Sequence, residues 1–304
     1  MITVVIPTHN RKANIRLTLT GLKQQSLKKD LFEVVLVDDG STDMTSDILE
    51  EFKEVFPKFK YAYIFKKDVW NASRPRNFGA KLAEKDSEAF LFVDSDVVLN
   101  PDALASYHED LQINSDRVVI GPYNFLPPQM VTPLDIEHNF DLFKTGQLPK
   151  MSSNGGGMGH IGNDVRKQSF EKATTPNDLF DEAFDGLACF GGNLLIRKSI
   201  FWRAGGYDEE TLCGLEDGDF GLTLWSYGIK FSYDIRCMGF HNWHPIPNGR
   251  HPANIKEQID RLNMKHFGTS DQKLIDYTKS AYDKWGFKNW QPPAEWLTEE
   301  GKEK

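Results

Sequence analysis

The sequence predicts an α/β fold in which a mostly parallel, Rossmann-like sheet is flanked by helices. Short runs that are apolar throughout alternate with segments whose apolar residues recur at helical spacing. This alternation is typical of parallel strands that are buried on both faces and joined by helical crossovers. The 304 residues are 39% hydrophobic and 26% charged, which suits a globular protein with a sizeable core.

The alternation is clearest in residues 1–121. Strands are predicted at residues 2–6, 32–37, 61–65 and 89–93. Helices are predicted at residues 14–22, 41–56 and 75–83, with another beginning near residue 101. Ser41 suits the cap of the second helix, and Pro75 suits the first position of the third.

The second half of the chain is less regular. Between residues 122 and 185 the alternation is lost, and a glycine-rich run from Ser152 to Gly159 predicts a mobile loop near residues 150–185. Order returns with a strand at 194–196, helices at 198–204 and 217–227, and two short strands flanking Asp234. Beyond Pro252 the pattern is helical. We therefore expect a body of residues 1–250, with halves at 1–121 and 122–250, and a helical extension of residues 251–304.

Composition excludes some classes of protein. The formal charge of −8 and the pI near 5.5 argue against nucleic-acid binding, which needs a basic face. The three cysteines show neither zinc-site spacing nor an even count for disulfides, so we expect a reducing, cytoplasmic location. No apolar run approaches the roughly 20 residues of a membrane span, and no basic leader begins the chain.

Polar residues follow three of the predicted strands at the point where each strand ends. The clusters are Pro7-Thr8-His9-Asn10-Arg11, Asp38-Asp39-Gly40-Ser41 and Asp94-Ser95-Asp96. Because ligands of open parallel sheets bind at the carboxyl ends of the strands, we expect these clusters to meet in one site. Carboxylates repel a diphosphate unless a divalent cation lies between them. The sequence therefore predicts a cation site at Asp94-Ser95-Asp96.

The motifs resemble those of the GT-A fold glycosyltransferases of family two. In the first 100 residues the resemblance rests on V-V-I-P-T-H-N-R, V-L-V-D-D-G-S-T-D, P-R-N-F-G-A and F-V-D-S-D. Further on it rests on F-G-G-N-L-L-I-R-K-S-I-F-W-R-A-G-G-Y-D-E, G-L-E-D-G-D-F and R-C-M-G-F-H. This later part, the acceptor half of the fold, is especially similar to galactosyltransferases and polypeptide N-acetylgalactosaminyltransferases.

The resemblance implies a nucleotide-sugar site. The residues it assigns to the donor are Pro7, Thr8, Arg11, Asp39, Arg76, Asn77, Asp94 and Ser95. Among them Asp39 would accept from a uracil N–H, and Asp94 would face the ribose. Arg76 would approach donor phosphate or ribose near a helix N-terminus, with Arg74 an equally placed competitor. From the residues themselves, Gly192 lets a sugar ring approach the backbone and Asn193 can hydrogen-bond a hydroxyl.

The resemblance also implies a metal and a general base. Asp96 and His241 would hold Mn²⁺ or Mg²⁺, with His244 an alternative to His241, and the imidazole favours manganese. Asp217, beside Glu216, would take the acceptor proton, although acidic residues also simply suit a helix start. The implied reaction is an inverting single displacement from a UDP-hexose or UDP-N-acetylhexosamine.

Several alternatives stay open. The acceptor is a saccharide, a lipid-linked glycan, a polymer or a peptide, since residues 122–185 carry no motif that selects one. A non-catalytic sugar-nucleotide or glycan binder would keep the fold but need no base. A sugar nucleotidyltransferase would want a glycine-rich loop after the first strand, which P-T-H-N-R lacks. Trp285, Trp290 and Trp296 would pack on the body, mediate a dimer or touch a membrane surface, and we favour packing.

Overall fold

The computed structural model describes eight segments of the chain. They are residues 1–65, 71–113, 116–126, 131–144, 179–180, 189–211, 215–242 and 255–268. The predicted loop at 150–185 lies almost wholly outside them, as do His244, Cys213 and the three C-terminal tryptophans. Among the described residues no helix combines the length and apolar character that a membrane span requires.

A mixed sheet of eight strands forms the centre of the molecule, in the order β3-β2-β1-β4-β9-β6-β10-β8. Its strands are β1 (Ile2–Thr8), β2 (Phe32–Asp38), β3 (Phe59–Tyr63), β4 (Ala89–Val93), β6 (Arg117–Ile120), β8 (Leu179–Phe180), β9 (Asn193–Arg197) and β10 (Lys230–Tyr233). Strands β1 to β4 are parallel, which confirms the predicted α/β fold. Strand β9 runs antiparallel between β4 and β6. An apolar run reads alike in both directions, so the sequence held no sign of this reversal.

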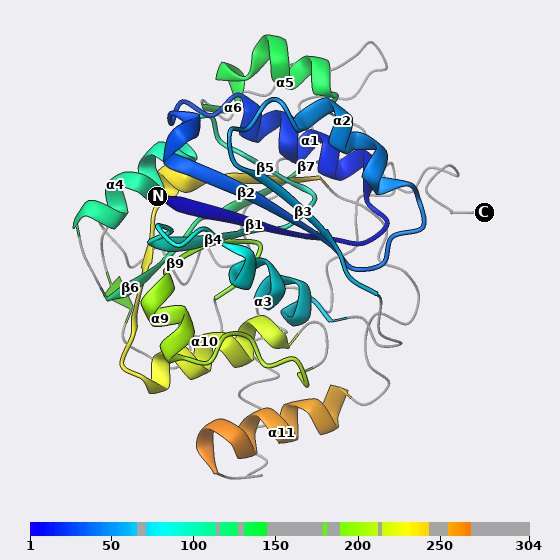
Figure 1. The fold of residues 1–304 in the computed structure, drawn as a ribbon. Helices are drawn as coiled ribbons and strands as arrows, with labels where there is room; N and C mark the ends of the chain where they lie inside the picture. The colour runs from blue at the N-terminus through cyan, green and yellow to red at the C-terminus, as the bar shows by residue number, and fades with distance from the viewer. Residues whose placement is uncertain are drawn as a thin grey trace, which may run out of the picture.

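Helices cover both faces of this sheet (Figure 1). They are α1 (Lys12–Lys23), α2 (Leu49–Phe52), α3 (Ser73–Leu82), α4 (Ala103–Ile113), α5 (Pro133–Asn139), α6 (Asp141–Lys144), α9 (Lys198–Arg203), α10 (Glu216–Ser226) and α11 (Ile255–Phe267). Helices α1 and α4 bury apolar side chains such as Leu19 and Leu104 in one core cluster. Helices α9, α10 and α11 bury Phe201, Phe220 and Leu262 in a second cluster on the other face.

A second, three-stranded sheet in the order β5-β11-β7 was not predicted from the sequence. Its strands are β5 (Val97–Leu99), β11 (Gly239–Asn242) and β7 (Tyr123–Leu126). Strand β5 begins directly after the Asp94-Ser95-Asp96 turn, and β11 pairs with it antiparallel. Two of the three strands come from the second half of the chain, so the sheet joins the two halves next to the predicted cation site.

Two predicted helix boundaries are wrong. The helix expected at 41–56 is reduced to a 3₁₀ turn, Thr45–Ile48, and the single turn of α2. The polar side chains before it form local turns instead, since Asp38 accepts from the Ser41 amide at 2.7 Å and Asp43 from the Thr45 amide at 3.1 Å. Helix α3 begins at Ser73, two residues before Pro75, because Asn71 Oδ1 accepts from the Ser73 amide at 2.7 Å.

Candidate active site

The ends of β1 and β2 bring together two of the predicted nucleotide contacts. The Asp39 amide donates to the Thr8 carbonyl at 2.8 Å, and both residues are buried. Thr8 Oγ1 has no hydrogen-bond partner among the described residues. The Asp39 carboxylate lies 3.4 Å from Arg74 Nη1, which also donates to the Phe65 carbonyl at 2.6 Å. Arg74 is therefore placed beside the predicted uracil contact.

The loop between β1 and α1 carries Arg11 to the same edge. Asn10 takes a positive φ of 50° and its Oδ1 accepts from the Thr42 amide at 2.7 Å, which ties this loop to the one after β2. Pro7 is the penultimate residue of β1, opposite Val37 of β2. Arg11 follows the turn at the start of α1 and is half-buried. The predicted clusters after β1 and β2 thus do converge.

The Asp94-Ser95-Asp96 turn connects β4 to β5. Its shape is fixed from both sides, because the Asp94 amide donates to the Gly192 carbonyl at 3.0 Å and Thr18 donates to the Ser95 carbonyl at 3.0 Å. Asp96 is buried, whereas the Asp94 side chain keeps 34% of its surface exposed. The two carboxylates therefore face different surroundings, one enclosed and one open.

Strand β11 brings His241 to Asp96 from the far end of the sequence. His241 stands opposite Val97 of β5, and its Nε2 lies 3.3 Å from Asp96 Oδ1. The next residue, Asn242, donates its amide to the Asp96 carbonyl at 2.8 Å. Two ligands at right angles on an ion with bonds near 2.1 Å are about 3 Å apart. The carboxylate and imidazole thus have the spacing and chemistry of neighbouring ligands of one divalent ion.

Arg76 joins the two acidic parts of the predicted site. Its Nη1 donates to Asp217 Oδ1 at 2.8 Å, and its Nη2 donates to Asp94 Oδ1 at 3.0 Å. Glu216 Oε1 is 3.9 Å from the same Nη1. The Arg76 side chain is only 3% exposed, against 25% for Asp217. The guanidinium therefore lies behind the carboxylates of Asp94 and Asp217, which are partly exposed.

The charge on Arg76 is secured by its neighbours. Burial alone lowers the pKa of a guanidinium, but Asp217 and Asp94 outweigh this and hold the pKa of Arg76 well above its ordinary value. The guanidinium carbon also lies 5.2 Å from the centre of the Tyr207 ring. Tyr207 is a residue of the site that sequence reasoning missed, and its only signal was its place in the G-G-Y-D-E motif.

Two glycines let these side chains approach the backbone. A methyl group on Gly191 would lie 2.5 Å from Asp217 Oδ1 and 2.8 Å from Arg76 Cζ. One on Gly192 would lie 2.2 Å from Asp94 Oδ2. Both positions therefore require glycine, since any side chain would displace the carboxylates or the arginine.

Two predicted donor contacts have other partners in the structure. Asn193 is fully buried, where its Oδ1 accepts from Tyr107 at 2.8 Å and its Nδ2 donates to the Cys237 carbonyl at 2.8 Å. Asn77 donates to the Tyr207 carbonyl at 2.8 Å and accepts from the Tyr207 amide at 2.9 Å. Both amides thus support the site from behind, and the sugar contact that we expected of Asn193 does not fit its enclosed position.

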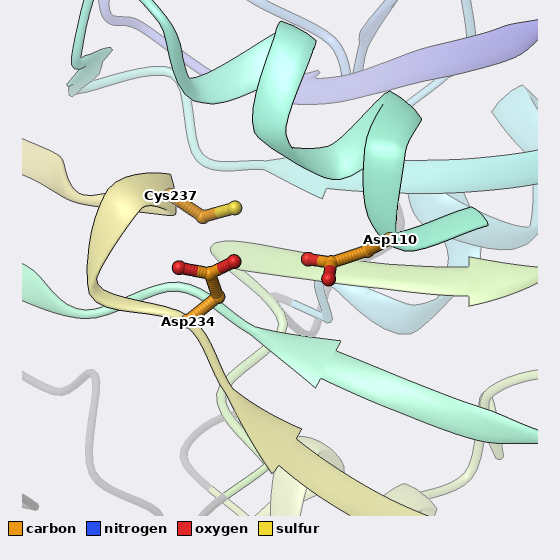
Figure 2. A group of neighbouring side chains, drawn as sticks. All are labelled: Asp110, Asp234 and Cys237. Carbon is orange, nitrogen blue, oxygen red and sulfur yellow. The ribbon is translucent and has the colours of Figure 1, made fainter. Parts of the chain in front are cut away.

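Outside the predicted site lies a buried cluster of Asp110, Asp234 and Cys237, whose potential ligand atoms all fall within 4.8 Å of one another (Figure 2). Positive charge is already supplied there. Arg236 donates to both oxygens of Asp234, at 3.1 Å and 2.6 Å, and Arg117 Nη2 lies 3.5 Å from Asp110. We therefore assign the cluster to internal ion pairing. Asp110 lies far from Asp234 and Cys237 in the sequence, which gave no sign that the three would meet.

A family model agrees with this architecture. The model described as glycosyl transferase family 2 matches residues 3–204. The chain belongs to glycosyl transferase family 2. Its match includes all of the predicted donor residues and Asp96, whereas Asp217 and His241 lie beyond it. The family assignment confirms that the chain is a glycosyltransferase.

Relatives of this family member include polysaccharide synthases. Hyaluronan synthase of Pasteurella multocida is 32% identical over 250 residues, which are 80% of this chain and 25% of that protein. Chondroitin synthase of Escherichia coli is 30% identical over 287 residues, which are 91% of this chain and 40% of that protein. Validoxylamine A glucosyltransferase of Streptomyces hygroscopicus subsp. limoneus is 28% identical over 278 residues, which are 88% of this chain and 57% of that protein. The chain thus spans a quarter to somewhat over half of these relatives.

Solved structures share the fold of this glycosyltransferase. The structure of residues 1–349 of TarS from S. aureus in complex with UDP-GlcNAc superposes with a TM-score of 0.66 at 19% identity, covering 95% of this chain and 74% of that one. Residues 1–349 of the same protein in complex with UDP give a TM-score of 0.62 at 20% identity, covering 93% and 72%. These neighbours confirm the GT-A type of α/β fold. The special similarity to N-acetylgalactosaminyltransferases that we expected in the second half is not among these findings.

Proposed function

We propose that this glycosyltransferase moves a hexose or N-acetylhexosamine from a UDP-sugar to an acceptor hydroxyl, with inversion at the anomeric carbon. The observation that carries the proposal is the pair of hydrogen bonds from Arg76 to Asp217 and Asp94. These bonds hold a partly exposed carboxylate of α10 beside the turn that follows β4. The UDP and UDP-GlcNAc complexes of a protein with this fold support the choice of donor.

Asp217 acts as the general base in this proposal. Its carboxylate is partly exposed, and Arg76 fixes its orientation by a 2.8 Å hydrogen bond. A carboxylate held in this way can accept the proton of an acceptor hydroxyl as that oxygen attacks the anomeric carbon. Glu216 is buried and lies 3.9 Å from Arg76, so it adds negative charge behind the base without facing the acceptor.

Asp96 and His241 would hold a divalent cation, Mn²⁺ or Mg²⁺. Their donor atoms are 3.3 Å apart on the turn after β4 and on β11. When bound, such an ion neutralises the diphosphate that leaves the sugar. Asp39, at the ends of the first two strands, would accept from the uracil N–H, and Thr8 and Arg11 would flank the nucleotide.

Calorimetric titration of UDP, GDP and TDP, each with Mn²⁺ and with chelator, tests donor and metal together. We expect UDP to bind and chelator to weaken it at least tenfold. Binding of GDP or TDP in preference to UDP would contradict the donor class. Equal UDP binding with chelator would contradict the metal site.

The alternative of a non-catalytic sugar-nucleotide binder is tested by Asp217→Asn. Transfer from UDP-glucose and UDP-GlcNAc to a panel of saccharide and polyol-phosphate acceptors would be followed by release of UDP. The base assignment predicts a loss of at least 100-fold in transfer with donor affinity unchanged. If the wild-type protein binds UDP but releases none from a UDP-sugar with any acceptor, the result supports the non-catalytic binder. If the variant transfers normally, Asp217 is not the base.

A further inference from the structure

The first turn of α10 is held from two opposite sides. Successive residues of an α-helix are about 100° apart, so residues two positions apart point in nearly opposite directions. Asp217 points to Arg76, as described above. Asp219, two residues on, points away from it toward α11, the helix that lies outermost beyond α10 (Figure 1).

Asp219 is only 2% exposed, and its side-chain partners come largely from α11. Lys265 Nζ lies 2.8 Å from Asp219 Oδ2, and His266 Nε2 lies 2.6 Å from Asp219 Oδ1. Thr211 Oγ1 is a further neighbour, at 3.4 Å. An ionised carboxylate is costly to bury unless it is paired and hydrogen-bonded. The conformation of the first turn of α10 therefore depends on α11.

The same helix also holds the segment before α10, in which Tyr207 lies. Lys265 Nζ is 2.8 Å from Asp208 Oδ2, so one ammonium group bridges Asp208 and Asp219. Arg261 donates to the Glu210 carbonyl at 2.9 Å. Tyr207, next to Asp208, places its ring under the Arg76 guanidinium. Lys265 thus connects the first turn of α10, which carries Asp217, to the segment whose Tyr207 lies against Arg76.

Apolar packing makes this attachment specific. Ile259 and Leu262 of α11 are 3% and 2% exposed and belong to the core cluster that contains Phe220 of α10 and Tyr207. The helix is therefore part of the same core as the active-site elements, although its residues lie outside the matched family model, which ends at residue 204.

We propose that α11 is a working part of the catalytic site, with Lys265 and His266 as positioning residues for the base. They act through Asp219 and touch neither donor nor acceptor. The inference rests on the proposed function, in which Asp217 is the base. Because transfer requires the base within hydrogen-bond reach of the acceptor oxygen, a displacement of about 1 Å can reduce the rate by roughly 100-fold.

A positioning role for α11 should affect the rate of transfer but not the affinity for the donor nucleotide. The nucleotide residues Thr8 and Asp39 and the cation pair Asp96–His241 lie on the first strands and the small sheet, away from α11. Loss of the Lys265–Asp219 contact should therefore lower kcat by about 10- to 100-fold and leave the Kd for UDP within about twofold. A purely structural role would lower the Tm without this split.

The test uses Lys265→Met, His266→Gln, Asp219→Asn and the double variant Lys265→Met/Asp219→Asn in the full chain. The matched control is Lys23→Met, which removes the same charge from a 2.8 Å surface ion pair with Glu137 on the other face of the sheet. For each protein, kcat of UDP-sugar transfer, Kd for UDP with Mn²⁺, and Tm are measured. We expect each single variant at Asp219, Lys265 and His266 to lower kcat and the control to leave it unchanged.

The double variant decides whether Lys265 acts through Asp219. If it does, the factor by which Lys265→Met reduces kcat is at least fivefold smaller in the Asp219→Asn background than in the wild-type background. Unchanged kcat in the single variants, or parallel losses of kcat and UDP affinity, would overturn the role of α11 while leaving the proposed function intact. Absence of transfer by wild-type protein would instead overturn the proposed function, and the positioning role with it.

Discussion

Asp110 offers the sharpest test of the electrostatics inside this fold. Burial, and next the charge of Asp234, raise the pKa of its carboxyl to about 7, although Arg117 and Arg236 oppose the shift. Figure 2 shows the carboxyl pointing toward Asp234 and Cys237, whose Sγ faces the same space. The folded protein therefore still holds a proton on this pair of carboxyl groups as the pH approaches neutrality.

This raised pKa makes the folded state less stable as pH rises. Between the unfolded pKa near 3.8 and the folded pKa near 7, the folded protein binds more protons than the unfolded chain. Stability is therefore lost across this window with increasing pH. A shift of about three pH units at about 1.4 kcal/mol per unit sets a ceiling of about 4 kcal/mol. We expect about 2 kcal/mol, because the cluster relaxes when the acid ionises.

Asp110→Asn should remove this loss. The amide oxygen can still accept from Arg117, and the amide N–H₂ can donate to Asp234 where the acid places its proton. The free energy of unfolding, measured in urea, should increase for the variant relative to wild type by about 2 kcal/mol between pH 4.5 and pH 8. Asp102→Asn, at a partly exposed carboxylate outside the cluster, serves as the control and should show no such trend. A difference between variant and wild type that is the same at both pH values would refute the reasoning.

Three further predictions concern the active site itself. Tyr207→Phe should leave the free energy of unfolding unchanged or raise it by about 1 kcal/mol, because Tyr207 Oη is buried with no hydrogen-bond partner among the described residues; a clear loss of stability in thermal unfolding would contradict this. Gly191→Ala should lower the rate of transfer at least tenfold with UDP affinity retained, because the new methyl group would displace Asp217 and Arg76. A normal kcat would show that transfer does not require Asp217 and Arg76 to keep their positions. His241→Ala should weaken Mn²⁺ binding, measured by calorimetry, at least tenfold; unchanged affinity would remove His241 from the metal site.

The polar residues at the ends of the first strands were predictable because their positions depend on short-range order. A buried strand followed by Asp38-Asp39 or by Asp94-Ser95-Asp96 brings its carboxylates to the carboxyl edge of a parallel sheet wherever the sheet forms. The sequence could not give the pairing of β5 with β11, which depends on residues 97–99 meeting residues 239–241. The approach of His241 to Asp96 follows from that pairing, so the sequence alone could only infer it from resemblance.

Asn193 shows a second limit. Its place after two glycines suggested an amide open to a sugar, but burial decides its role. Tyr107 and the Cys237 carbonyl, from α4 and the 3₁₀ turn Ile235–Cys237, take up its side chain. Such partners are more than 40 positions away along the chain. Local patterns fix which polar groups exist, whereas long-range packing decides which of them stay available to a ligand.

Arg74 and Arg76, which the sequence left as equally placed candidates, take different positions because of helix geometry. Residues two apart on α3 are separated by about 200° around the axis, so the two side chains must leave the helix in nearly opposite directions. Arg74 consequently reaches Asp39 at the end of β2, while Arg76 turns inward to Asp94 and Asp217. The arginines are therefore not competitors for one position. One lies beside the predicted base-recognition residue, and the other links Asp94 to the proposed general base.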